Sequence, residues 1–213
     1  MPGWLYKEDF DETRDRLTKW WKGGDIGRPA MQITVPRAEP VEKVPEMPKP
    51  QGWTCHYSTT NFDYRVNMAV QSCLKTHFVA EAMPHASPDL APNCLALYLG
   101  CKGVEGENTV WCQPFIKDPA RAEFRLDPEN FYWKFTMRLA RAQLELGRKR
   151  FLTAFPDLIE GLDTLAAMRD TETLLVDLVE RPEWVQKSLA QITDRYFEAY
   201  DQLYNLMKDD RGG

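Results

Sequence analysis

Apolar side chains recur every three or four residues in several segments, and this spacing predicts amphipathic helices. The longest such segment begins at Pro182, and its apolar stripe consists of Val185, Leu189, Ile192, Tyr196, Tyr200, Leu203 and Met207. Shorter segments predict helices over residues 8–21, 61–75, 92–99, 160–168 and 172–179. Asp127-Pro128-Glu129 has the cap, first-turn proline and acid of a helix start, and Gly147 is expected to end that helix.

Short alternating or apolar runs predict strands between these helices. The expected principal strands cover residues 30–35, 77–83 and 150–155, and residues 109–112 form an accessory strand. Residues 36–52 are an expected loop with prolines at 36, 40, 45, 48 and 50, and its length suggests a lid or an arm. Alternating strands and helices predict an α/β fold with a parallel sheet. We expect one domain over residues 1–213, in which residues 1–29 form an N-terminal helical arm.

Charge and composition narrow the class of protein. The 213 residues carry 27 Lys and Arg against 32 Asp and Glu, a net charge of -5, which argues against nucleic acid or an acidic membrane as partner. No apolar run reaches the length of about 18 residues that a membrane span needs. The odd number of cysteines, five, and an N-terminus without signal-peptide features predict reduced thiols in the cytoplasm.

Three segments carry a family resemblance: Phe155-Pro156-Asp157-Leu158, the segment 163–170 beginning Asp163-Thr164-Leu165-Ala166, and the segment 177–185 containing Arg181-Pro182. They resemble the strand, the Thr-Leu-Ala helix start and the proline-led long helix of uroporphyrinogen decarboxylase-like proteins. Gly27-Arg28-Pro29-Ala30-Met31 resembles the start of that family's first strand. The chain thus resembles the N-terminal portion of the uroporphyrinogen decarboxylase and corrinoid (coenzyme M-type) methyltransferase superfamily, in a divergent branch. The resemblance implies a (β/α)8 TIM barrel of which only the N-terminal part is present, because closing one takes about 250 residues.

The chain departs from the family pattern at residues that the decarboxylases use to bind their substrate. The decarboxylases hold substrate carboxylates with two arginines after the first strand, whereas this chain offers only Arg37. Their pocket tyrosine is matched here by Ala167 and Met168. The resemblance therefore favours part of a methyltransferase acting with a corrinoid or thiol partner, whose zinc ligands would lie beyond Gly213. On this interpretation the chain alone holds no cofactor and is inactive.

Two other interpretations stay open. A lyase that decarboxylates a carboxylated small molecule would need an anion pocket around Arg37. A non-catalytic binding or assembly module would pair the open half-barrel with a second copy or a complementing partner, so that no strand edge is left exposed.

Barrel enzymes place their sites at the carboxyl ends of strands, and this rule selects four residues. Arg37 and Asp157 are the expected substrate-binding residues, and His85 and Asp89 the expected catalytic ones. Each has a structural alternative: a solvated loop arginine, a turn aspartate, a surface histidine, and an aspartate that caps the next helix.

No metal or dinucleotide site is expected within this chain. His85, Cys94, Cys101 and Cys112 are available as ligands, but their spacing matches no zinc motif. The glycines at 100, 103 and 106 lack the preceding strand and following helix of a dinucleotide fingerprint.

Overall fold

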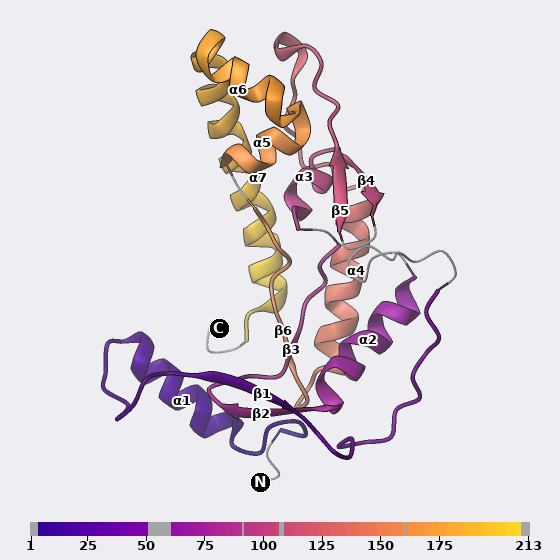
Figure 1. Cartoon of the computed structure of the whole chain (residues 1–213), viewed down its shortest axis with the longest axis vertical. Helices are drawn as coiled ribbons and strands as arrows, with labels where there is room; N and C mark the ends of the chain where they lie inside the picture. The colour runs from indigo at the N-terminus through magenta and orange to yellow at the C-terminus, as the bar shows by residue number, and fades with distance from the viewer. Residues whose placement is uncertain (1–3, 51–60, 91, 107–108, 160, 210–213) are drawn as a thin grey trace. The chain divides into compact units, whose positions relative to one another are not determined.

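The computed structural model describes residues 4–50, 61–90, 92–106, 109–159 and 161–209. Within these ranges the chain is mixed α/β, with seven α-helices, three two-stranded sheets and no closed barrel (Figure 1). It divides into two compact units. The first comprises Met1–Lys49, Asn61–Ser87 and Arg141–Ala154, and the second comprises Pro50–Thr60, Pro88–Ala140 and Phe155–Gly213.

The structure confirms most of the helices that the periodic spacing predicts. They are α1 (Phe10–Trp21), α2 (Phe62–Leu74), α3 (Cys94–Tyr98), α4 (Phe131–Leu146), α5 (Gly161–Arg169), α6 (Thr171–Glu180) and α7 (Pro182–Met207), with a short 3-10 turn, η1, at Pro119–Arg121. None of the helices in the described part of the chain has the length and apolar character that a membrane span requires.

The start of α4 differs from the sequence prediction. The side chain of Asp127 accepts the N–H of Glu129 at 2.9 Å, which makes a separate turn instead of a cap. The capping bond comes from Asn130, whose side-chain oxygen accepts the N–H of Trp133 at 3.1 Å. The helix therefore begins later than predicted, although it ends before Gly147 as expected.

The first sheet of the first unit is antiparallel, so the expectation of a parallel sheet is wrong there. Strand β1 (Gln32–Pro36) pairs with β2 (Thr76–Ala80), with Pro36 opposite Thr76. The connection between them explains the direction. The segment that follows β1 lies antiparallel to α2, so that its first residues are next to the end of the helix. The N–H of Val41 there donates to the carbonyl of Leu74 at 3.2 Å. Strand β2 consequently starts where β1 ended.

Residues 37–50, the described part of the predicted proline-rich loop, lie along α2 and not over a site. The side chain of Asn67 accepts the N–H of Met47 at 3.1 Å and donates to the carbonyl of Pro45 at 2.9 Å. Gln71 donates to the carbonyl of Val44 at 2.9 Å. The idea of a free lid or arm is therefore not supported for this segment, which is bonded to the helix; residues 51 and 52 lie outside the described residues.

A short parallel pair forms the second sheet of the first unit. Strand β3 (His85–Ala86) pairs with β6 (Leu152–Thr153), and flanking bonds of 2.8 Å join Leu152 to Pro84 and Ala154 to Ala86. The sequence predicted one strand over residues 77–83 and a loop at His85. Ala80 instead has a positive φ of 54°, which ends β2 and turns the chain into β3.

Glycine-rich residues that were predicted to form a loop contribute a strand in the second unit. Strand β4 (Lys102–Glu105) pairs antiparallel with β5 (Val110–Gln113), the predicted accessory strand. Gly100, with a φ of 118°, ends α3 as predicted.

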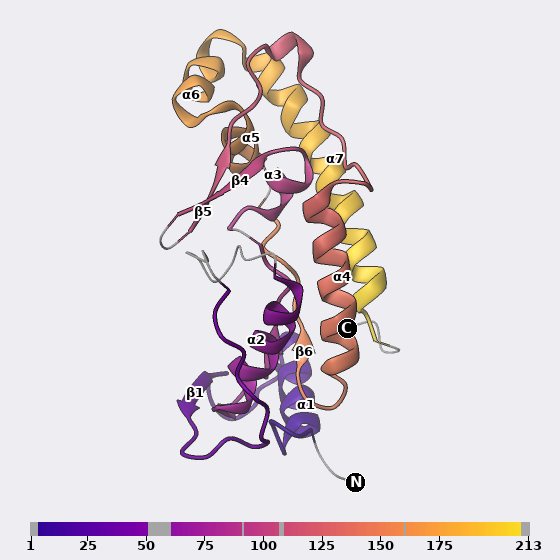
Figure 2. The same ribbon diagram turned by 90° about the vertical axis from the view of Figure 1, so that its right-hand side faces the viewer.

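Each unit has its own buried apolar side chains. In the first unit, Phe151 and Tyr6 join the inner face of α2 in one cluster, against which Val44 of the proline-rich segment also packs. In the second unit α5 packs on α3, α6 and α7 (Figure 2), and its Leu165 and Met168 are completely buried. The Ile192 and Leu203 positions of the predicted α7 stripe are also fully buried, which confirms the orientation of that helix.

Candidate functional site

The same tripeptide follows each strand of the parallel pair. Pro88-Asp89-Leu90 comes shortly after β3 and leads to α3, and Pro156-Asp157-Leu158 comes shortly after β6 and leads to α5. This repeat was the signal in the sequence that could have linked the two aspartates, and the sequence analysis treated them separately. We call residues 88–90 and 156–158 the Pro-Asp-Leu loops.

The structure brings two of the predicted site residues, Asp89 and Asp157, together in the second unit. The carboxylate of Asp89 accepts the N–H of Asp157 at 2.5 Å, and the carbonyl of Asp157 accepts the N–H of Cys94 at 3.0 Å. Asp89 is half-buried, whereas Asp157 is exposed. The alternative in which Asp89 caps the next helix is wrong, because Asn93 is the N-cap residue of α3.

Asn93 and Thr164 join the helices that follow the two loops. The side-chain oxygen of Asn93 accepts the N–H of Ala96 at 3.0 Å, which caps α3, and also accepts the Thr164 hydroxyl at 3.3 Å. That hydroxyl is 2.5 Å from the carbonyl of Ile159. Asn93 is half-buried and Thr164 is fully buried, and their contact joins α3 to α5. The sequence analysis did not select either residue.

Aromatic side chains lie beside the second loop. Phe155, directly before Pro156, stacks on Tyr200 of α7 with ring centroids 4.9 Å apart. Tyr200 also stacks on Tyr196 and Tyr204, one helical turn away on each side. The sequence placed Tyr196 and Tyr200 on the apolar stripe of α7, and all three tyrosines are half-buried. Carboxylates next to aromatic faces can accept N–H donors and can attract a cationic group.

Arg37 lies in the first unit and is bonded to backbone. Its Nε donates to the carbonyl of Thr76 at 2.9 Å, and Nη2 donates to that of Tyr6 at 3.3 Å. It lines a cavity of about 300 Å³ together with Lys7 and His77. Lys7 is almost fully buried and donates to the carbonyls of Phe78 and Ala80, so these cations are engaged by protein acceptors. Both of these Arg37 bonds go to backbone carbonyls. The role of Arg37 in binding an anion stays a prediction.

His85 also belongs to the first unit and lies on the surface. Its ring Nδ1 is 3.0 Å from the carbonyl of Met83, and its own carbonyl accepts the Cys73 thiol at 3.5 Å. These are local contacts of the kind expected for a surface histidine. His85 also belongs to a different unit from the two Pro-Asp-Leu loops, which are in the second unit.

The sequence analysis missed the most heavily bonded acid of the first unit, Glu81. Its carboxylate accepts two bonds from Arg28, at 2.6 and 2.7 Å, one from Arg16 at 3.0 Å and one from the N–H of Met31 at 3.0 Å. The Arg28 guanidinium, more than the other donors, lowers the pKa of Glu81 to about 2. Arg28 belongs to the segment Gly27-Arg28-Pro29-Ala30-Met31 that carried part of the family resemblance, and its contacts here are structural.

The described residues contain no group of three or more histidines, cysteines or acids that could hold a metal ion. Cys101 and Cys112 donate their thiols to carbonyls, and the sulfur of Cys94 accepts the N–H of Leu90 at 3.4 Å. Zinc therefore has no ligand set among these described residues.

The Pro-Asp-Leu loops are the best candidate site, because they bring two predicted residues together beside aromatic side chains. No protein-family model, curated protein or solved structure matches the chain.

Proposed function

We propose that this chain is the N-terminal portion of a (β/α)8-type enzyme of the uroporphyrinogen decarboxylase-like methyltransferase kind. In this proposal a small-molecule substrate binds over the Pro-Asp-Leu loops. The observation that carries it lies in the second unit: the two Pro-Asp-Leu loops, each of which leads into a helix (α3 or α5), are bonded to each other through Asp89. Barrel enzymes place their substrates on the loops that follow parallel strands.

The charge of the two loops favours one class of substrate. Two carboxylates, Asp89 and Asp157, repel a carboxylated ligand and attract a ligand with N–H donors or a cationic nitrogen. The aromatic faces of Phe155 and Tyr200 suit the methyl groups of such a ligand. Methyl transfer from a methylated amine to a corrinoid or thiol partner fits this site better than decarboxylation, for which Arg37 would have to leave its backbone acceptors.

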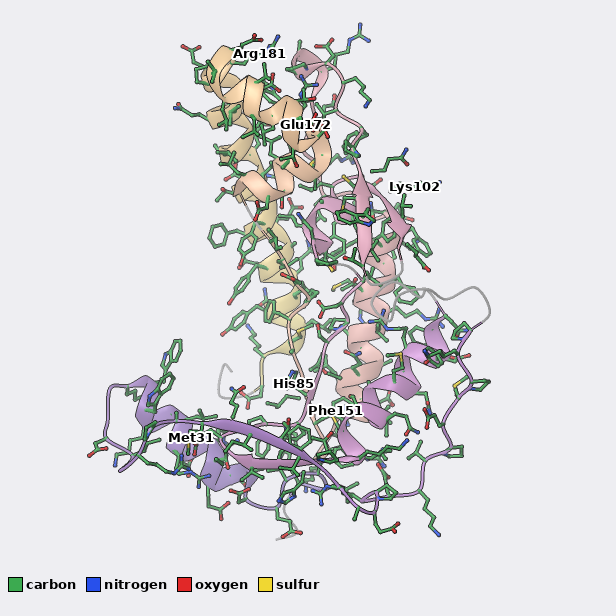
Figure 3. The ribbon with its side chains drawn as sticks, in the orientation of Figure 1. Met31, His85, Lys102, Phe151, Glu172 and Arg181 are labelled. Carbon is green, nitrogen blue, oxygen red and sulfur yellow. The ribbon has the colours of Figure 1, made fainter. Side chains whose placement is uncertain are left out.

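A non-catalytic assembly module is the second candidate, and β1 favours it. Met31, labelled in Figure 3, is followed at alternate positions by Ile33 and Val35, and these side chains are 42%, 42% and 46% exposed. A two-stranded sheet with an apolar face in water is only marginally stable by itself. A second copy or another partner that covers this face would stabilise it.

Thermal unfolding with added ligands separates the candidates. We expect millimolar methylated amines to raise the melting temperature by about 3–6 °C, which is the shift for a ligand at about ten times its Kd. Asp157→Asn should abolish this shift. Asp163→Asn, which removes an exposed acid from α5, is the matched control and should retain it.

Other results would replace the proposal. A shift produced by tricarballylate, a tricarboxylate, and abolished by Arg37→Gln would favour the lyase. If no ligand shifts the transition and light scattering gives a dimer that Ile33→Lys dissociates, the assembly module is favoured.

A further inference from the structure

Two cysteines lie together at the base of the β4–β5 hairpin. Cys101 directly precedes β4, and Cys112 lies on β5 opposite Gly103. Because side chains alternate along a strand, continuing β4 back by two residues from Gly103 places Cys101 on the same face as Cys112. Gly103 has no side chain to separate them, and the electrostatic properties of the two thiols are coupled.

The surroundings of the two thiols differ. Cys101 is 1% exposed and donates to the carbonyl of Ala167 at 3.5 Å, whereas Cys112 is half-buried and donates to the carbonyl of Asn93 at 3.9 Å. When Cys112 ionises, the S–H of Cys101 can donate to its sulfur. The neighbouring thiol thereby lowers the pKa of Cys112 and raises that of Cys101. Cys112 is thus the more accessible and more acidic thiol, and Cys101 is a second thiol within reach.

We propose that Cys101 and Cys112 are an oxidation site, at which a peroxide converts the two thiols into an intramolecular disulfide. The Cys112 thiolate attacks one oxygen of hydrogen peroxide, the O–O bond breaks, and the departing hydroxide takes up a proton as water. Cys112 is then a sulfenic acid. The sulfur of Cys101 attacks the Cys112 sulfur, the S–O bond breaks, and the oxygen leaves as water with the proton of Cys101. Two thiols and one peroxide give one disulfide and two waters.

The reaction would change contacts next to the Pro-Asp-Leu loops. Forming the disulfide removes both S–H donors, so the carbonyls of Ala167 and Asn93 lose those bonds. Asn93 caps α3 and bonds to Thr164, so the oxidised state alters the support of the candidate site. The oxidation site itself does not depend on the proposed function, because its chemistry needs no substrate.

The other described cysteines provide internal controls. Cys73 lies in the first unit, and burial raises the pKa of its thiol to about 11. Cys94 is fully buried in α3 of the second unit. Both lie on helices, α2 and α3, and not on the β4–β5 hairpin that holds Cys112.

The test is peptide mapping of the folded full chain after exposure to hydrogen peroxide. Titratable thiols in denaturant should fall from five per chain to three, as two are consumed. After thiol blocking and digestion with trypsin, the peptide of residues 76–102 should be joined to that of residues 103–117 by a bond that dithiothreitol cleaves. Cys101→Ser and Cys112→Ser should each abolish the joined peptide, and Cys73→Ala should retain it.

Cys94→Ala must also retain the joined peptide, since residues 76–102 contain both Cys94 and Cys101. A link through Cys94, a disulfide between chains, or a sulfinic acid on Cys112 with Cys101 still reduced would overturn the proposal. The map of the unsubstituted chain gives this answer even if one of the variants fails to fold.

Discussion

Each unit of the chain contains a buried carboxylate held by two arginines, but the two clusters are built differently. In the first unit Glu81 is bound by Arg28 and Arg16, which come from 53 and 65 residues earlier in the chain. In the second unit Asp177 is bound by Arg169 at 2.7 Å and Arg181 at 2.6 Å, from the ends of adjacent helices. The first cluster joins distant segments, and the second braces a local helix corner.

The arginines of the two clusters differ in solvent exposure, and this sets how much stability is lost when the carboxylate is removed. The side chains of Arg28 and Arg16 are 37% and 33% exposed, so both guanidinium groups can be rehydrated if Glu81 is lost. Arg169 is 9% exposed and also donates to the carbonyls of Ile116 and Lys117. It cannot move into water without breaking those bonds. A buried cation without its counter-ion is more costly than an exposed one.

The largest expected effect is therefore that of Asp177→Asn. We predict a loss of about 3–5 kcal/mol in the free energy of unfolding, because Arg169 stays buried without its partner. Urea denaturation followed by circular dichroism measures it. Asp201→Asn, which changes an exposed acid on α7, should cost less than about 0.5 kcal/mol. Equal losses in the two variants would contradict the buried-pair explanation.

Glu81→Gln should cost less, about 2 kcal/mol, although Glu81 accepts more hydrogen bonds than Asp177 does. The amide can keep some of these bonds, and both arginines can turn toward water. The same urea denaturation measures the difference between the two variants. If Glu81→Gln proves the more damaging, exposure of the arginines does not govern the energetics of these clusters.

Acid should destabilise the protein through both carboxylates. Arg28 lowers the pKa of Glu81 to about 2, and Arg169 lowers that of Asp177. A lowered folded-state pKa gives stability that is present above the unfolded-state value, near 4, and is lost as the pH falls through the folded value. We predict a falling unfolding free energy between about pH 5 and pH 2. The fall should be shallower in Glu81→Gln, which unfolding titrations at fixed pH values would show.

The smallest effect is expected for Arg181→Gln. The Arg181 side chain is 45% exposed, so solvent screens its bond to Asp177, and we expect a loss below about 1 kcal/mol. Raising the salt concentration should reduce this difference, since exposed pairs are screened. A loss as large as that of Asp177→Asn would mean that Arg181, and not Arg169, is the principal partner.

Local periodicity predicted the helices but not how strands pair. The stripe on α7 was readable because Val185, Ile192 and Leu203 repeat over a long element. By contrast, β3 and β6 each have only two residues and show no period. The antiparallel direction of β2 depends on where the proline-rich segment returns the chain, and no local pattern carries that information.

The candidate site was predictable in part. The rule that loops after strands carry function selected Asp89 and Asp157, but it did not reveal that one carboxylate binds the backbone of the other loop. Asn93 was read only as part of a short helix. Glu81 was missed because its partners are remote in sequence, and a single acid at a strand end shows no pattern.

The bonding of residues 37–50 to α2 has a consequence for the rate of refolding. Five prolines lie between positions 36 and 50, and in an unfolded chain each X–Pro bond is cis in roughly 10–30% of molecules. More than about a third of unfolded chains therefore hold at least one wrong isomer in this segment. The described peptide bonds are all trans, and a cis Val44–Pro45 bond would misplace the two carbonyls that Gln71 and Asn67 meet until it isomerises. Refolding should show a phase of tens of seconds that a prolyl isomerase accelerates.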